Sequence, residues 1–148
     1  MRVYIAGAYS ARDLLRSVAA QLEDVGHTIT SRWLNADHAI REGTIDAAPD
    51  QSDGYCQEHV GKDFEDIDES DLLLLYTGNA LVAMDPSLEG HTSSGGRHVE
   101  TGYALASGLT VIVVGEPENV FHRGACIVVP GLESALLAIS SIRRERGF

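Results

Sequence analysis

The sequence is poor in cysteine, in basic residues and in long apolar runs, and each shortage excludes a class of protein. Its 148 residues include two cysteines, too few for a disulfide framework, and neither has the companions of a zinc site. No apolar run approaches about 18 residues, so we expect no membrane span. The first residues show no signal-peptide pattern, and a reducing cytoplasm is the natural location.

Basic residues are outnumbered two to one, since 22 acidic and 11 basic side chains give a formal net charge of −11. A chain of this charge is repelled by a nucleic-acid backbone, so we expect no nucleic-acid polymer as partner. A small anionic ligand is still compatible with it, because a helix N-terminus and a single arginine act locally.

Several catalytic and cofactor motifs are also missing. The turn after the first apolar run lacks the GxGxxG of dinucleotide-binding proteins, and neither a P-loop nor the GxSxG elbow of a serine hydrolase occurs. His98 and His122 have no HxxxH spacing and no paired acids, so we expect neither a metal site nor a cofactor.

Apolar runs of strand length alternate with segments of helical period, and this alternation is typical of a parallel α/β sheet. The predicted strands are residues 2–6, 27–33, 72–76, 110–114 and 126–129. The predicted helices are residues 10–25, 55–70, 96–107 and 132–144. Long loops are expected at residues 35–54, 77–95 and 115–124, the first with a short helix around 36–41. We expect one domain spanning residues 1–148, a doubly wound five-stranded parallel sheet with helices on both faces.

The stretch of residues 93–108 is a glycine-rich turn that runs into a helix, where free backbone N–H groups attract anions. Glu100 is expected in the first turn of that helix, where an acid often only complements the helix dipole. Its position on the predicted ligand rim favours a nucleophile, ionised at neutral pH because free glutamate has a pKa of about 4.3. Gly96 and Gly102 leave space beside it, and Gly102 is expected to keep the helix close to the sheet.

Asp63 differs from the other acids of its predicted helix because it lies beside the apolar stripe of Val60 and Ile67. We expect it to point inward, with a raised pKa that lets it carry a proton for a leaving group. Tyr4 is by default a core residue of the first strand, but its hydroxyl would orient a ligand or side chain at the rim. Trp33 is more often packing than a stacking surface, although a flat base would suit it.

Three motifs together resemble the nucleoside 2-deoxyribosyltransferase superfamily, which includes the 2′-deoxynucleoside 5′-monophosphate N-glycosidases. They are Val3-Tyr4-Ile5-Ala6-Gly7, Asp63-Phe64-x-x-Ile67-x-x-x-Asp71 and Gly95-Gly96-Arg97-His98-Val99-Glu100-x-Gly102-x-Ala104. The resemblance implies a flavodoxin-like fold, a homodimer or higher assembly, and cleavage of an N-glycosidic bond through a covalent glycosyl–enzyme intermediate. It matches Glu100 to the nucleophile, Asp63 to the aspartate that assists departure of the base, and Tyr4 to the tyrosine that positions the nucleophile.

The resemblance also implies where a nucleoside or nucleotide would bind. Ser94 stands where the nucleotide hydrolases carry a serine that contacts a 5′-phosphate and the transferases carry an aspartate. Further contacts are predicted from Gly96 at the helix start, and from Gly7, Ser10 and Arg12 in the turn after the first strand. Family members often take one polar residue from the neighbouring subunit, and the candidates here are Asn119 and His122.

Hydrolysis and transfer to a second base both remain open at this stage. A non-catalytic nucleotide-binding module would use the same residues. A phosphoribohydrolase of the lysine-decarboxylase-like family is a more distant alternative, since its PGGxGTxxE turn is similar to residues 95–100 but the proline and threonine are missing here.

Overall fold

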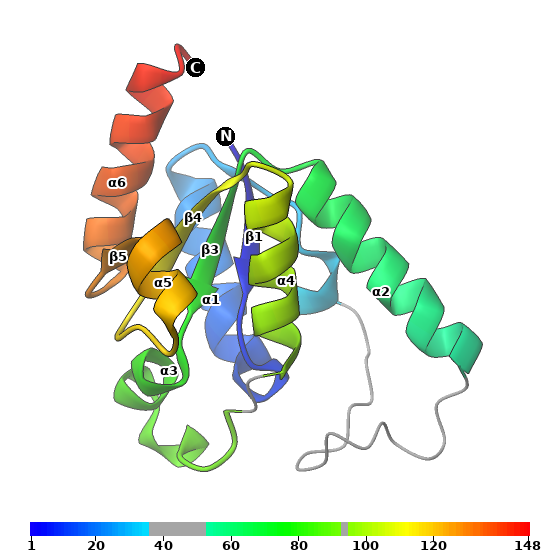
Figure 1. The fold of residues 1–148 in the computed structure, drawn as a ribbon. Coiled ribbons are helices and arrows are strands. Elements are labelled where there is room, and N and C mark those ends of the chain that lie inside the picture. Colours follow the sequence, from blue (N-terminus) through cyan, green and yellow to red (C-terminus); the bar gives the residue numbers. More distant parts are fainter. Residues whose placement is uncertain (36–52, 93–94) are drawn as a thin grey trace.

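A five-stranded sheet forms the centre of the computed structural model, which describes residues 1–35, 53–92 and 95–148 (Figure 1). The strands are β1 (Arg2–Ala6), β2 (Thr28–Ile29), β3 (Leu72–Tyr76), β4 (Thr110–Val114) and β5 (Ile127–Val129). Their order is β2-β1-β3-β4-β5, and each neighbouring pair is parallel. This architecture confirms the predicted doubly wound, flavodoxin-like α/β class.

Helices cover both faces of this sheet. The helices are α1 (Arg12–Asp24), α2 (Asp53–Asp68), α3 (Gly78–Met84), α4 (Gly95–Ala106), α5 (Val120–Ala125) and α6 (Leu132–Glu145). Three short 3-10 helices join them, η1 (Tyr9–Ala11), η2 (Arg32–Leu34) and η3 (Pro86–Leu88). In Figure 1, α4 crosses the front of the sheet between α2 and α5, while α1 lies behind it. Right-handed crossovers require this division of the helices between the faces.

The central strand β3 is the most deeply buried element of the sheet. All five of its residues are 0% exposed, because helices cover both faces and β1 and β4 cover both edges. Burying each leucine side chain stabilises the fold by roughly 1.5–3 kcal/mol. This explains why the strand is apolar at every position rather than at alternate ones.

The predicted strand at residues 27–33 is wrong in its extent, because β2 ends after two residues. The chain then turns into η2, and side chains take over the hydrogen bonds that a longer strand would have made. The Ser31 hydroxyl accepts from the backbone N–H of Ile5 at 2.5 Å, and the Trp33 ring N–H donates to the Ile5 carbonyl at 2.8 Å.

Two predicted loops contain helices. Polar side chains, which are also typical of loops, cap the starts of α5 and η3. Asn119 caps α5 by accepting from the backbone N–H groups of Phe121 and His122. Asp85 caps η3 in the same way, and α3 lies directly after β3. Such caps satisfy N–H groups that have no partner within the helix. The short helix expected around residues 36–41 lies outside the described residues.

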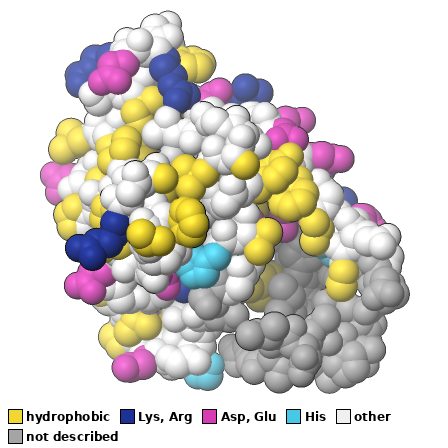
Figure 2. All heavy atoms as spheres, in the orientation of Figure 1, with side chains coloured by type: hydrophobic (Ala, Val, Ile, Leu, Met, Phe, Trp, Pro, Cys, Tyr) yellow, Lys and Arg dark blue, Asp and Glu magenta, His cyan; other side chains and the backbone are white. Residues whose placement is uncertain are grey.

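The carboxyl ends of β1, β3 and β4 lie side by side, as expected for the ligand rim. Ala6 is in register with Leu75, and Tyr76 is in register with Val114, so the segments that follow these strands leave the sheet together. Figure 2 shows the α4 face of the molecule, where apolar side chains gather beside histidine near the middle. Within the described ranges no helix is long and apolar enough to cross a membrane.

Candidate active site

The site is built around a hydrogen bond between the sheet and the helix that covers it. The hydroxyl of Tyr4, a residue of β1 that is 0% exposed, donates to Oε1 of Glu100 in α4 at 2.6 Å. Two of the three sequence candidates for catalysis are therefore in direct contact. Because the tyrosine is held by the sheet, it fixes the position of the carboxylate.

Glu100 lies deeper in its helix than expected. Helix α4 begins at Gly95, so Glu100 is in the second turn, and no acidic residue occupies the first. The expected position in the first turn is therefore wrong, and the alternative in which Glu100 only complements the helix dipole loses support, because the dipole acts mainly within that turn.

The ionisation expected for Glu100 is also corrected by its surroundings. Burial raises the pKa of Glu100 to about 8; the hydrogen bond from Tyr4 lowers it, and the charge of Asp63 raises it. A carboxyl group with few water neighbours favours its neutral form, which the value for free glutamate does not include. The pKa of Tyr4 is raised as well, first by burial and then by the charges of Glu100 and Asp63.

Asp63 reaches the same site from α2. It is half-buried, and burial together with the charge of Asp66 raises its pKa to about 6, while the charge of Arg32 lowers it. The raised pKa confirms that part of the sequence prediction. The stripe that led to it is only half correct, since Ile67 is fully buried but Val60 is 51% exposed.

The turn after β1 holds its residues through contacts with the next segments. A Cβ at Gly7 would lie 2.6 Å from Cδ1 of Leu15, so this glycine is required for α1 to pack closely. The Ser10 hydroxyl donates to the His91 carbonyl at 2.6 Å, three residues before Ser94 in the chain. Arg12 donates to the Tyr9 hydroxyl at 2.6 Å and lies over its ring.

Trp33 is not placed to stack on a base. Its side chain is 7% exposed beneath Tyr9, with the ring centroids 6.4 Å apart, and its ring N–H is already donated to Ile5. The indole therefore packs the turn onto β1, which is the default interpretation of a tryptophan at a strand end.

The glycines of α4 face open space rather than the sheet. Gly96 and Gly102 are exposed, and an added Cβ at either would meet no atom within 4 Å. The expectation that Gly102 keeps the helix close to the sheet is thus wrong; Ala104, which is fully buried, faces the sheet instead. Ser94 lies outside the described residues.

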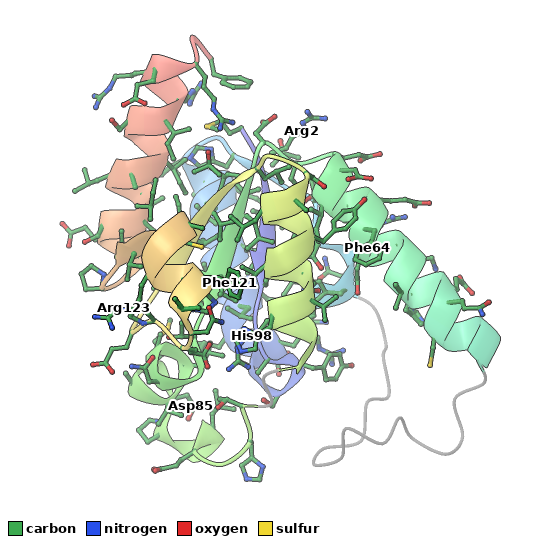
Figure 3. The ribbon with its side chains drawn as sticks, in the orientation of Figure 1. Arg2, Phe64, Asp85, His98, Phe121 and Arg123 are labelled. Atoms are coloured by element: carbon green, nitrogen blue, oxygen red, sulfur yellow. The ribbon has the colours of Figure 1, made fainter. Side chains whose placement is uncertain are left out.

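Asn119 and His122 lie on the other flank of α4 from Glu100. With His98 they line a cavity of about 450 Å³ between α4 and α5, and Figure 3 shows His98 and Phe121 at its two sides. His98 precedes Glu100 by two residues, so the two side chains leave the helix roughly 200° apart. The structure therefore does not bring Asn119 or His122 to the Tyr4–Glu100 pair of their own chain.

Two structures of known proteins are similar to this chain over most of its length. The CMP N-glycosidase BcmB of Clostridium botulinum is 19% identical, with 95% of this chain and 98% of that chain covered and a TM-score of 0.54. A 2-deoxyribosyltransferase of Bacillus psychrosaccharolyticus is 18% identical, with 91% and 90% covered and a TM-score of 0.60.

At these identities the likeness shows the fold. The two structures confirm the fold that the resemblance implies, and both neighbours are of the enzyme types that the resemblance names. Neither the protein-family models nor the curated proteins contain a match to the chain.

Sequence reasoning missed two ion pairs that join α4 and α2, the helices of Glu100 and Asp63, to other segments. Arg97, which is 3% exposed, donates to Glu118 through Nε at 3.0 Å and through Nη2. Burial alone would raise the pKa of Glu118, but the bonds and charge of Arg97 outweigh it and lower the pKa. The second pair joins Arg32 to Asp66 at 2.5 Å. Neither has a sequence signal, because the partners are 21 and 34 residues apart.

Metal ligands do not gather around these residues. Among the residues that the structure describes, no group of three His, Cys, Asp or Glu side chains is placed to hold a metal ion.

Proposed function

We propose that the protein cleaves the N-glycosidic bond of a 2′-deoxynucleoside or its 5′-monophosphate, with Glu100 as the nucleophile. The observation that carries this proposal is the 2.6 Å hydrogen bond from Tyr4 to Glu100, with the titrating group of Asp63 close enough to act on both. Displacement at an anomeric carbon requires one ionised carboxylate and one carboxyl group that carries a proton, and Glu100 and Asp63 can share one proton between them. The two structural neighbours, an N-glycosidase and a deoxyribosyltransferase, support the same kind of reaction.

In the first step an oxygen of ionised Glu100 forms a bond to C1′ of the sugar. The bond from C1′ to the base nitrogen breaks, its electron pair stays on the base, and Asp63 gives that base a proton. In the second step water or another base attacks C1′, the ester bond to Glu100 breaks, and Asp63 takes back a proton. Tyr4 donates to the carboxylate of Glu100 and holds it in line with C1′.

The reactive form of the pair carries one proton, on Asp63. With pKa values of about 6 for Asp63 and about 8 for Glu100, the single proton resides mainly on Glu100. The reactive arrangement is therefore the less populated of the two. Desolvation thereby makes the carboxylate scarce and at the same time more reactive, because it has few water contacts to lose.

A 5′-monophosphate is the substrate form that the surroundings favour. The first turn of α4 contains no acidic residue, so no carboxylate of that turn would repel a phosphate bound at its backbone N–H groups. Ser10 is tied to His91, which brings the turn after β1 to the segment that leads into α4. Arg12 in the same turn supplies a positive charge.

A homodimer would give Asn119 and His122 a role in this reaction. They lie on the flank of α4 away from Glu100, beside Phe121, which is 66% exposed. From that flank Asn119 would reach the site of a neighbouring subunit, while His122, which is 0% exposed, would act through its 3.2 Å hydrogen bond with Asn119. We place this enzyme in the cytoplasm, in keeping with the unpaired thiols of Cys56 and Cys126.

The test is release of free base from a panel of deoxynucleosides and their 5′-monophosphates, followed by chromatography. We expect turnover, faster for the monophosphates, and loss of it in Glu100→Gln; Glu116→Gln, at an exposed glutamate, serves as the control. Rapid quenching and mass spectrometry should show a deoxyribosyl group on Glu100. Adding a second base distinguishes transfer from hydrolysis. Tight binding of nucleotide without turnover, unchanged in Glu100→Gln, would instead indicate a binding module.

A further inference from the structure

The turn of Ser31, Arg32 and Trp33 joins the strand that carries Tyr4 to the helix that carries Asp63. Its first and last residues hold β1: the Ser31 hydroxyl accepts from the N–H of Ile5, and the Trp33 ring N–H donates to the Ile5 carbonyl. Ile5 is the residue next to Tyr4. The 31–33 turn is therefore fixed to the strand at the level of the proposed active site.

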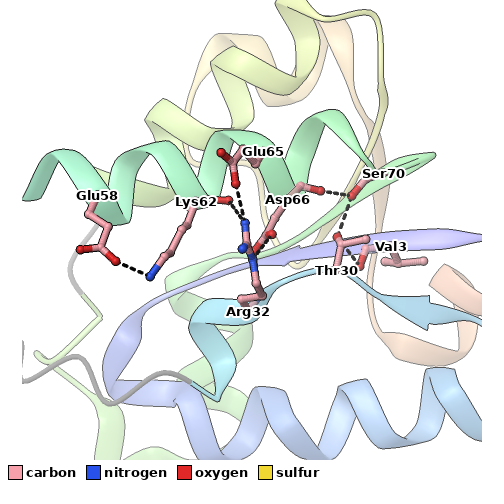
Figure 4. A network of polar contacts seen from close by, with 8 residues as sticks. All are labelled: Val3, Thr30, Arg32, Glu58, Lys62, Glu65, Asp66 and Ser70. Atoms are coloured by element: carbon pink, nitrogen blue, oxygen red, sulfur yellow. Dashed lines mark hydrogen bonds and ion pairs between the residues drawn. The ribbon is translucent and has the colours of Figure 1, made fainter.

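The middle residue of the turn holds α2. The Arg32 backbone N–H donates to Oδ2 of Asp66 at 2.8 Å, and its Nε donates to Oδ1 at 2.5 Å. Its Nη2 donates to the Lys62 carbonyl at 3.2 Å and to Glu65 at 3.0 Å (Figure 4). These four bonds span the helical turn from Lys62 to Asp66, which includes Asp63.

Further bonds connect the residues that follow α2 to the residue that follows β2. Ser70 donates to the Asp66 carbonyl at 2.7 Å and is 2.7 Å from the Thr30 hydroxyl (Figure 4). The Asp66 side chain is 4% exposed, although the Arg32 side chain is 53% exposed. A carboxylate so buried needs its partner, because an unpaired buried charge is costly.

We propose that Arg32 and Asp66 are positioning residues for Asp63: they hold its helical turn against the strand of Tyr4 and supply opposite charges beside it. The inference rests on the proposed function, in which Asp63 gives its proton to the departing base. Among the described residues, the charges of Arg32 from η2 and Asp66 from its own helix act on Asp63. Asp63 in turn acts on Tyr4 from β1 and on Glu100 from α4.

The two residues act on Asp63 with opposite sign. The charge of Asp66 raises the pKa of Asp63, and the charge of Arg32 lowers it. Removing the negative charge with Asp66→Asn should therefore lower the pKa, whereas removing the positive charge with Arg32→Gln should raise it, each by about one unit. If both residues only stabilised the fold, replacing them would not shift the pKa of Asp63 in opposite directions.

A matched control exists at the other end of β1. The Arg2 backbone N–H donates to Oδ2 of Asp71 at 2.7 Å, and its Nη2 donates to Oδ1 at 3.2 Å, the same two-point pairing as between Arg32 and Asp66. Arg2→Gln and Asp71→Asn therefore remove comparable bonds at the end of the sheet opposite the ligand rim. Arg32→Lys keeps the charge beside Asp63 but loses the planar fork.

The experiment measures the pKa of Asp63 by NMR, from the ¹³Cγ shift of labelled aspartate, in the full chain and each variant, with Asp63→Asn as the assignment. Near-ultraviolet circular dichroism checks that each variant is folded. We expect opposite shifts for Asp66→Asn and Arg32→Gln, little change for Arg32→Lys, and none for the Arg2 and Asp71 variants. On a deoxynucleotide, Asp66→Asn should lower kcat at least about tenfold with little change in KM, because a lower pKa makes the protonated form of Asp63 scarcer.

The outcome separates this inference from the function on which it rests. Shifts of the same sign, or no shift in folded Arg32→Gln, would overturn the roles of Arg32 and Asp66 even in an active enzyme. Opposite shifts in a protein that turns over no nucleoside or nucleotide would support the electrostatic arrangement and overturn the proposed function.

Discussion

Tyr4 and Glu100 are 96 residues apart in the chain and share a 2.6 Å hydrogen bond between the hydroxyl of one and the carboxyl group of the other. Tyr4 is 0% exposed and Glu100 is half-buried, so each affects the proton of the other. The chemistry of the site therefore depends on where a small number of protons reside. The first two predictions follow from this dependence.

The activity of the wild-type protein should follow a bell-shaped pH profile. Below about pH 6 both carboxyl groups hold protons and no nucleophile is present; above about pH 8 both are ionised and the departing base receives no proton. The limbs belong to the pair rather than to either residue. Measuring kcat/KM across about pH 4 to 10 checks this. Activity that rises steadily to alkaline pH would show that no proton donor is needed.

Tyr4→Phe should reduce kcat about 10- to 100-fold, because a hydrogen bond to a charged group contributes about 1.5–3 kcal/mol. Loss of the bond that lowers the pKa of Glu100 raises that pKa, so the alkaline limb of the profile should move upward. Comparing pH profiles of the two proteins tests both effects. Tyr76→Phe is the control, since its hydroxyl is buried at the end of β3 without a hydrogen-bond partner among the described residues. An alkaline limb that stays in place would contradict the assigned role of Tyr4.

Folding stability should decline as pH rises through neutrality. Glu100 has a folded pKa of about 8, above its value in an unfolded chain, so the native state binds more protons between about pH 4.5 and 8. The stabilisation present below the unfolded pKa is lost as pH passes the folded pKa. Glu100→Gln removes this loss and should stabilise the protein at pH 9 by roughly 2–4 kcal/mol relative to wild type.

Thermal unfolding at pH 4 and pH 9 measures the effect. Wild type should melt several degrees lower at the higher pH than Glu100→Gln does, and the two should be nearly equal at the lower pH. The exposed Glu116→Gln variant should follow wild type at both. Equal melting temperatures for all three proteins at pH 9 would mean that Glu100 is well solvated.

Two glycine substitutions should have opposite effects on stability. Gly7→Ala places a methyl group 2.6 Å from Leu15 and should cost about 1–3 kcal/mol, partly recovered by Leu15→Val. Gly61→Ala lies at an exposed position inside α2 with no atom within 4 Å, and should stabilise by about 0.5–1 kcal/mol. Urea unfolding of the single and double variants measures both. A neutral Gly7→Ala would indicate that α1 moves freely on the sheet.

Local sequence patterns predicted most of the fold but fewer of the contacts and ionisation states in the candidate site. The apolar run from Leu72 to Tyr76 predicts its strand because every residue there is buried. The end of β2 is set by contacts of Ser31 and Trp33 with Ile5, which no local pattern contains. The same reason applies to the pKa of Glu100, since burial by distant segments decides it.

The site residues follow the same division. Glu100, Asp63 and Tyr4 can be proposed from motifs, and the structure joins Tyr4 to Glu100. Arg32 and Asp66 cannot, because an exposed arginine after a strand and one acid among many in a helix carry no distinguishing pattern. The sequence predicts Asn119 to be a loop residue, but it caps α5. An amide side chain favours both loops and helix starts, so the sequence alone does not distinguish them.

The way the 31–33 turn occupies Ile5 also protects the sheet from aggregation. A sheet edge with free N–H and C=O groups can recruit a strand from another molecule. Here the edge strand β2 is two residues long, and beyond it the outward-facing backbone groups of β1 are taken by a serine hydroxyl and an indole N–H. At the end of β1 nearest the proposed active site, Ile5 thus offers no free backbone group on which a strand of another chain could pair.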